Sequence, residues 1–206
     1  MQGPEIPGFA TGPVLLAHRG IVWHRASREG RDFLLKTANL SSAESSTLLQ
    51  REFNLLRTKS IAGIPKPLEF LRMGHQATIV FDGEAGEVLS RVLAREKAME
   101  ILRLLDVAVA IVEVVQSFHA NGITHRSLTE ERILLHADGR VVVLDFHNAT
   151  TFVQERAPAL MAAADMDMHY LAPEQTGRTN LLVDFRADLY ALGALFYKML
   201  TGRLPF

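Results

Sequence analysis

The sequence contains no cysteine, which excludes disulfide bonds, thiolate metal sites and thiol nucleophiles. It also lacks an excess of one charge, because 22 basic and 23 acidic residues give a formal net charge of -1 at pH 7. A chain balanced in this way has no overall attraction for nucleic acid or for an anionic membrane. The most apolar stretch, residues 101–115, is interrupted by Arg103, Asp106 and Glu113, so it cannot span a bilayer.

What is present is the composition of an ordinary globular domain. The chain has 206 residues, of which 48% are hydrophobic and 22% charged. A chain of this size can bury a hydrophobic core without covalent staples. Residues 1–5 contain an acid and no basic segment, unlike a secretory signal, so a cytoplasmic location is expected.

The first eighty or so residues favour strands, with one helix among them. Residues 1–13, rich in glycine and proline, are expected to be a flexible lead-in. Strands are expected at residues 14–16, 20–23, 32–36, 68–72 and 76–82. Residues 41–59 have apolar side chains at helical spacing. The sequence therefore predicts a β lobe with one helix over residues 14–82.

From residue 83 onwards the sequence favours helices. The segment Gly83-Glu84-Ala85-Gly86 is the best linker candidate. Beyond it, helices are expected at residues 88–93, 98–119 and 187–200, with a strand at 141–144. The two longer helices are apolar on nearly every face, which is typical of buried helices. A largely helical lobe over residues 83–206 follows, and the fold class is α+β.

Charged and polar side chains recur at the ends of these elements. Taken one at a time, a lysine that ends a strand is usually solvated, and an aspartate after an apolar strand is often only a turn residue. In chain order, the candidates are Lys36, Glu52, the segment His125-Arg126-Ser127-Leu128, the segment Asp145-Phe146-His147, the segment Ala172-Pro173-Glu174, and Asp188. Their order and spacing as a set carry more weight than any one of them.

This ordered set resembles the protein kinase family, over residues 14–206. The resemblance implies a two-lobed fold with ATP bound in the cleft between the lobes. Lys36 matches the strand lysine that holds the nucleotide phosphates, and Glu52 matches the helix carboxylate that fixes this lysine. The nucleotide-binding residues that the resemblance implies are Gly20, Lys36, Glu52, Asp82 and Asp145.

The resemblance also implies roles in the second lobe. The segment at His125 looks like the catalytic loop HRDLxxxN, with Arg126 in it, and Asp145 looks like the metal-binding aspartate of DFG. Glu174 belongs to the APE motif and has a structural role in the family. Asp188 is similar to the buried aspartate that braces the backbone of the catalytic loop.

The catalytic loop and the DFG segment differ from the family pattern at several positions. Ser127 replaces the aspartate that accepts the proton of the substrate, and a neutral hydroxyl is a poor base at pH 7. Arg132 replaces the magnesium-binding asparagine and has no lone pair to offer a metal. Thr129 replaces the catalytic lysine, and His147 replaces the DFG glycine. Asp145 is left as a weak ligand for Mg²⁺, and the sequence predicts a pseudokinase that binds ATP.

A narrower resemblance concerns the last segments. Residues 173–180, 183–190 and 201–206 look like the kinase module at the N-terminus of bacterial hybrid proteins, which continue with an ATPase region and a sensor histidine kinase. This likeness implies linked or partner signalling domains. The chain stops where the family has several more helices, so we expect a truncated C-terminal lobe.

Three functions remain open on the sequence alone. The favoured one is an ATP-binding pseudokinase that regulates linked signalling domains. The second is an active Ser/Thr kinase with an atypical catalytic loop, and the third is an interaction scaffold whose cleft is closed by side chains such as Phe81 and His147. Arg132 has two interpretations: it pairs with Asp145 in place of a metal ion, or it points to solvent or pairs with Glu130 or Glu131.

Overall fold

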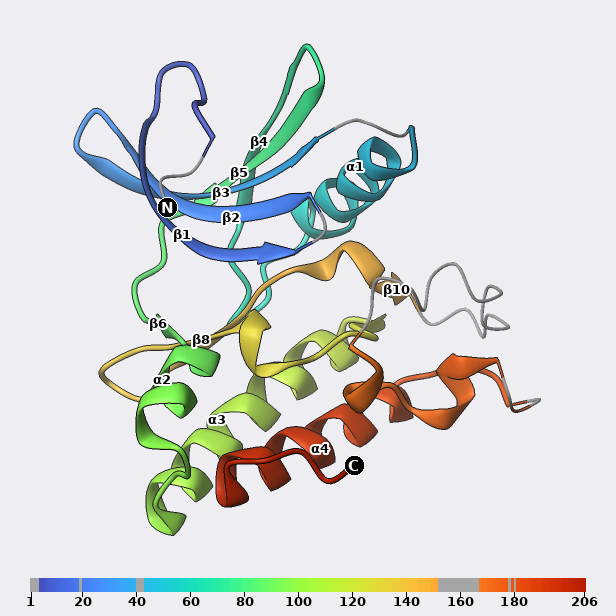
Figure 1. The fold of residues 1–206 in the computed structure, drawn as a ribbon. Coiled ribbons are helices and arrows are strands. Elements are labelled where there is room, and N and C mark those ends of the chain that lie inside the picture. The colour runs from blue at the N-terminus through green and yellow to red at the C-terminus, as the bar shows by residue number, and fades with distance from the viewer. Residues whose placement is uncertain (1–3, 19, 40–42, 152–166, 178, 180) are drawn as a thin grey trace. The chain divides into compact units, whose positions relative to one another are not determined.

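The chain forms two compact units in the computed structural model (Figure 1). The structure describes residues 4–18, 20–39, 43–151, 167–177, 179 and 181–206. Unit 1 comprises Met1–Ser60 and Ile64–Ala85, and unit 2 comprises Ile61–Gly63 and Gly86–Phe206. The main division therefore lies between residues 85 and 86, whereas the sequence places it between 82 and 83.

Unit 1 is a five-stranded antiparallel sheet with one helix, α1. The strand order is β1-β2-β3-β5-β4. The elements are β1 (Ala10–His18), β2 (Ile21–Arg28), β3 (Arg31–Asn39), α1 (Ala43–Arg57), β4 (Pro67–Met73) and β5 (Gln76–Asp82). Strands β2 and β3 are joined by Glu29 and Gly30, whose φ angles are 53° and 75°. Positive φ at both positions matches a tight hairpin turn whose twist suits the flanking strands.

One face of this sheet packs against the N-terminal segment. Ile6 is 2% exposed and joins a cluster with Phe33, Leu35 and other apolar residues of the sheet. The ring of Phe9 meets that of Phe33 edge-on at 5.4 Å between centroids. Strand β1 accordingly begins at Ala10, earlier than the sequence predicts, because two apolar residues dock the segment that precedes it. The glycine and proline content of this segment did not indicate that it docks on the sheet.

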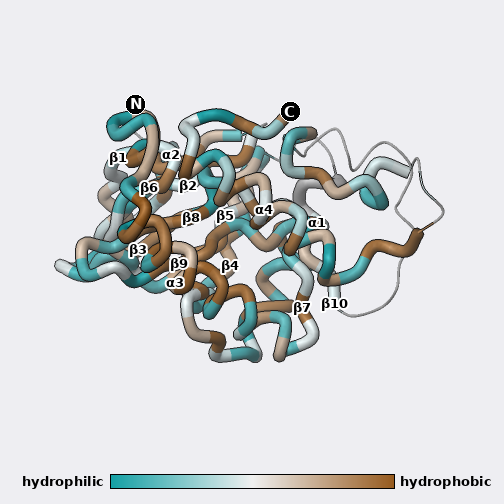
Figure 2. The backbone as a smooth tube through the Cα atoms, turned by 90° about the horizontal axis from the view of Figure 1, so that it is seen from below, coloured by the Kyte–Doolittle hydropathy of each residue, from teal (hydrophilic) through white to brown (hydrophobic). Residues whose placement is uncertain are grey.

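Unit 2 consists of helices and short strands. Its helices are α2 (Leu89–Glu96), α3 (Ile101–Ala120) and α4 (Arg186–Thr201). Its strands are β6 (Glu87–Val88), β7 (Ile123–Thr124), β8 (Ile133–Leu135), β9 (Val141–Val143) and β10 (Thr150–Thr151), and its 3₁₀ turns include η1 (Glu130–Arg132), η2 (Phe146–Asn148), η4 (Met168–Tyr170) and η5 (Pro173–Thr176). Strands β6, β8 and β9 form one small sheet, and β7 pairs with β10. Strands β8 and β9 consist of buried apolar residues, and hydrophobic segments are brown in Figure 2.

Helix α3 buries one face and exposes the other. Its buried residues are Leu104, Val107, Ile111, Val114, Val115 and Phe118. Leu102, Leu105, Val109 and Val112 form an exposed stripe, with Leu102 68% exposed. The prediction that this helix is buried all round is therefore wrong, because the described residues supply packing partners for one face only. None of the helices in the described ranges is long and apolar enough to cross a membrane.

Candidate functional site

Lys36 and Glu52 form a buried ion pair within unit 1. Strand β3 carries Lys36 and helix α1 carries Glu52, and the Lys36 ammonium contacts Oε2 of Glu52. Both side chains are 0% exposed. Trp23 lies opposite Lys36 on β2, with Nζ 5.5 Å from the indole centroid, and Trp23 stacks on Phe81 at 5.0 Å. The ammonium is thus held between a carboxylate and an aromatic face, both favourable to a cation.

Gly20 and Asp82 lie at the ends of strands of the same unit. Gly20 follows β1 with φ +82°, a conformation that favours glycine. Its carbonyl accepts a hydrogen bond from the backbone N–H of Asn39 at 3.2 Å. Asp82 ends β5 and pairs with Arg31, with Nη2 2.8 Å from Oδ1. Arg31 holds the pKa of the Asp82 carboxyl below its usual range. Asp82 therefore forms an ion pair with Arg31 at the protein surface.

Asp188 organises the loop after β7 in unit 2. It sits in the first turn of α4 and is 1% exposed. Its two oxygens accept hydrogen bonds from the backbone N–H groups of His125, at 2.9 Å, and Arg126, at 2.7 Å. His119 Nε2 lies 2.8 Å from Oδ2. These are the contacts that the resemblance implies for Asp188, and they fix the backbone that leads to Ser127.

His125 and Ser127 contact each other inside this loop. His125 Nε2 lies 3.0 Å from the carbonyl oxygen of Leu144, so Nε2 carries the proton and donates it. Nδ1 is then an acceptor, and it receives Ser127 N–H at 3.3 Å and the Ser127 hydroxyl at 3.4 Å. Burial lowers the pKa of His125 to about 4. At pH 7, therefore, a neutral hydroxyl bonded to a neutral imidazole occupies the position where the family has a carboxylate.

The depressed pKa of His125 predicts a loss of stability in acid. Unfolded His125 binds a proton near pH 6.5, whereas folded His125 binds one only near pH 4. Between these values the unfolded state holds more protons, so its free energy falls relative to the folded state as the pH drops. We expect this residue to remove about 3 kcal/mol of unfolding free energy from pH 6.5 to 4, and nothing above pH 6.5.

Chemical denaturation at several pH values checks this expectation. His125→Gln keeps a donor for the Leu144 carbonyl but does not titrate, so its unfolding free energy is expected to depend less on pH in this window. His24 is also buried, with a pKa lowered by burial, and His24→Leu serves as the companion variant. Equal acid sensitivity in wild type and His125→Gln would contradict the assignment.

Arg132 and His147 hold the two oxygens of Asp145. Arg132 ends turn η1 and donates from Nε to Oδ2 at 2.7 Å. His147 in turn η2 places Nδ1 2.9 Å from Oδ1. Nη1 of Arg132 also donates to the Ser127 carbonyl at 2.9 Å and contacts the Thr129 hydroxyl at 3.4 Å. The interpretation that Arg132 points to solvent is wrong, since its side chain is 5% exposed and paired with Asp145.

These residues do not fit a magnesium ion. Mg²⁺ takes oxygen ligands in octahedral geometry, and here both oxygens of Asp145 already accept hydrogen bonds from nitrogen donors. Arg132 offers no lone pair. No group of three or more His, Cys, Asp or Glu side chains in the described part of the chain is placed to hold a metal.

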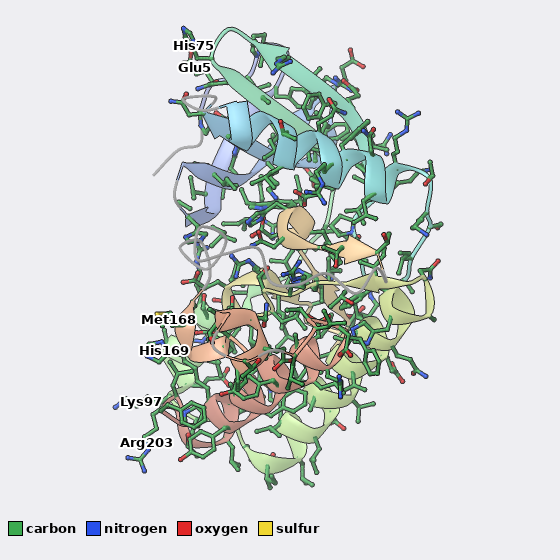
Figure 3. The ribbon with its side chains drawn as sticks, turned by 90° about the vertical axis from the view of Figure 1, so that its right-hand side faces the viewer. Glu5, His75, Lys97, Met168, His169 and Arg203 are labelled. Carbon is green, nitrogen blue, oxygen red and sulfur yellow. The ribbon has the colours of Figure 1, made fainter. Side chains whose placement is uncertain are left out.

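A second buried network joins three segments that the sequence did not connect. Glu130, 6% exposed, accepts a hydrogen bond from the Tyr170 hydroxyl and pairs with the ammonium of Lys198 on α4. Burial and the Glu130 charge raise the pKa of Tyr170. Met168 and His169, of the same turn as Tyr170, point outward (Figure 3). Because the partners come from three distant segments, no local motif could have indicated this network.

Glu174 of the APE motif and its neighbour Gln175 have different surroundings. It lies half-buried in η5, where its charge acts on Arg186. Its neighbour Gln175 donates from Nε2 to the carbonyl of Arg126 at 2.8 Å. Nothing in the sequence indicated a role for Gln175, whose side-chain amide bonds the carbonyl of the same Arg126 whose N–H donates to Asp188.

Comparisons with known proteins all identify similarity to protein kinases. Residues 20–206 match the family model described as "Protein kinase domain". The chain is 29% identical to serine/threonine-protein kinase pkn3 of Myxococcus xanthus over 184 residues, which is 84% of this chain and 33% of the relative. It is 32% identical to serine/threonine-protein kinase PknB of Mycobacterium tuberculosis over 129 residues, 62% of this chain and 20% of the relative. The matches therefore cover between a fifth and a third of these relatives.

Proposed function

Because the chain belongs to the protein kinase domain family, we propose that it binds ATP through Lys36 but does not transfer phosphate efficiently to proteins. The Lys36–Glu52 ion pair supports the first part, since it holds an ammonium in a fixed position suited to phosphate. The surroundings of Ser127 and Asp145 support the second part. In this proposal the chain is a pseudokinase.

The observation that carries the loss of transfer is the bond between Ser127 and neutral His125. A base takes up the substrate proton only if its pKa is matched to the task, and general base catalysis contributes about 10² to 10⁴ in rate. Ser127 is 5% exposed, and its hydroxyl faces an imidazole whose pKa is about 4. Neither group is suited to accept the proton of a serine or threonine substrate at pH 7.

Nucleotide binding is tested by thermal shift and by titration with a fluorescent ATP analogue. ATP at 100 times its Kd adds about 2.7 kcal/mol to the unfolding free energy, or roughly 5–10 °C for a chain of this size. We expect this shift in the wild type and in Lys66→Ala, a control that removes an exposed lysine of the same unit. We expect no shift in Lys36→Ala, with Lys36→Arg as a second variant should the alanine variant not fold.

Two other outcomes would contradict binding of ATP through Lys36. A shift that persists unchanged in folded Lys36 variants would show that ATP binds elsewhere. No shift with any nucleotide would favour an interaction scaffold over a nucleotide-binding module.

Phosphate transfer is tested with radiolabelled ATP and mass spectrometry. We expect neither autophosphorylation nor phosphorylation of a generic basic protein above the level of Lys36→Ala. Phosphoserine or phosphothreonine that depends on Lys36 would instead identify an active Ser/Thr kinase with an atypical loop.

The chain spans a third or less of the curated relatives it matches, so its larger role is also a proposal. We infer that the module regulates signalling domains linked to it or bound by it, of the ATPase and sensor histidine kinase type. The support is the resemblance of residues 173–180 and 183–190 to the kinase module of hybrid proteins. The test is whether Lys36→Ala, in the full-length gene product, changes autophosphorylation of a histidine kinase domain.

A further inference from the structure

Each oxygen of the Asp145 carboxylate accepts a hydrogen bond from a side chain of the same unit. Arg132 Nε and His147 Nδ1 each bond one oxygen, at 2.7 and 2.9 Å. The side chains of Arg132, Asp145 and His147 are 5%, 2% and 2% exposed. In the family, the residue at this position gives its oxygens to a divalent cation. Here, the same oxygens have nitrogen donors as partners.

Arg132 is anchored on both sides, so it is not a mobile counterion. Its Nη1 donates to the Ser127 carbonyl at 2.9 Å and contacts the Thr129 hydroxyl at 3.4 Å. A metal ion at Asp145 would compete with two buried hydrogen bonds for the carboxylate oxygens. It would also lie beside a guanidinium, which keeps its positive charge at every accessible pH and repels a cation.

The charge of Arg132 offsets that of Asp145. Asp145 carries one negative charge and Arg132 one permanent positive charge, and they touch in a buried position where their interaction is little screened. The carboxylate therefore needs no external cation to cancel its repulsion toward a phosphate group. An external cation would leave the group with an excess of positive charge.

We propose that Arg132 and His147 replace the divalent cation, so that this chain excludes Mg²⁺ from Asp145 and binds nucleoside di- and triphosphates as metal-free anions. The inference rests on the proposed nucleotide binding. It changes the chemical form of the ligand from a magnesium complex to the free polyphosphate. Arg132 and His147, which stand where the family has asparagine and glycine, together take the place of the cation at Asp145.

The experiment titrates a fluorescent ATP analogue with excess Mg²⁺ and with EDTA. We expect the two Kd values of the wild type to agree within about threefold. The double variant Arg132→Asn, His147→Gly restores the family residues at both positions, and we expect EDTA to weaken its binding tenfold or more. Arg140→Asn is the matched control, because Arg140 is an exposed arginine of the same unit paired with Asp138. We expect it to behave as the wild type does.

Several results would overturn the inference. A wild-type affinity that falls tenfold in EDTA would show that Asp145 still works through a metal. A folded double variant that remains indifferent to Mg²⁺ would show that Arg132 and His147 are not the cause. If circular dichroism shows that the double variant is unfolded, Arg132→Gln removes the positive charge alone and is held to the same criterion.

A second measurement separates failure of this inference from failure of the proposed function. Mn²⁺ binding is followed by electron paramagnetic resonance without nucleotide, in the wild type, in Asp145→Asn and in the double variant. Mn²⁺ bound by the wild type and lost in Asp145→Asn would overturn the exclusion of metal. Binding gained only in the double variant would support it, even if no nucleotide bound to the wild type.

Discussion

Replacing Lys36 with methionine is expected to destabilise unit 1 by about 3–5 kcal/mol. The reason is the fate of Glu52, whose side chain is 0% exposed and whose partner is the Lys36 ammonium. Without the ammonium, the buried carboxylate either loses the opposite charge that it touches here or must bind a proton, and both cost free energy. Chemical denaturation measures the loss directly, and thermal denaturation is expected to show a fall in Tm of roughly 6–20 °C.

Two further variants show whether the effect comes from burial of the pair. In the double variant Lys36→Met, Glu52→Leu, no charge remains, and we expect most of the lost stability to return. Arg31→Met breaks the Arg31–Asp82 pair, whose side chains are 60% and 48% exposed, and we expect a cost below about 1 kcal/mol. Equal costs for Lys36→Met and Arg31→Met would mean that the buried pair does not form in solution.

The larger elements could be predicted from the sequence because their patterns are long enough to repeat. Strand β5 has the predicted bounds, Gln76–Asp82, and helix α4 extends one residue further at each end than predicted. Strands β6, β7 and β10 have two residues each, too short for any periodicity, and they exist only because a partner strand lies beside them. Local pattern cannot supply that information.

Helix α3 shows a different limit. Its hydrophobic residues cover almost the whole circumference, from which the sequence predicts complete burial. An apolar side chain favours burial, but the sequence of the helix does not show whether a neighbouring element is present to bury it. Leu102 and Val109 are 68% and 57% exposed, on the face away from the buried residues.

Within the site, the contacts that could be predicted are those between residues of the motifs. The pairing of Lys36 with Glu52 could be anticipated from the motif positions of the two residues. For Arg132, the pairing with Asp145 was one of two interpretations that the sequence left open. The network at Glu130 could not, since Tyr170 and Lys198 are 40 and 68 positions away in the chain. Isolated tyrosines and lysines carry no signal of such contacts, and only the fold brings them together.

The second large effect is expected at Asp188. Its oxygens accept the backbone N–H groups of His125 and Arg126, both inside unit 2, and a contact from His119. Each buried donor left without an acceptor costs about 1–3 kcal/mol. Asp188→Ala is therefore expected to lower the unfolding free energy by about 3–5 kcal/mol, measured by chemical denaturation. Asp188→Asn keeps one acceptor oxygen, so we expect a smaller loss.

A matched control and a local measurement distinguish this bracing from a general effect on α4. Asp184 precedes the same helix and accepts from the backbone and side chain of Arg186 in a more exposed setting, so Asp184→Ala is expected to cost about 1 kcal/mol. Hydrogen exchange of Asp188→Asn is expected to speed up at the amides of residues 125 and 126. Unchanged exchange there, or equal costs for Asp184→Ala and Asp188→Ala, would contradict the bracing role. Faster exchange that extends to residues 127–132 would show that Asp188 also keeps the Ser127 carbonyl in place for Arg132.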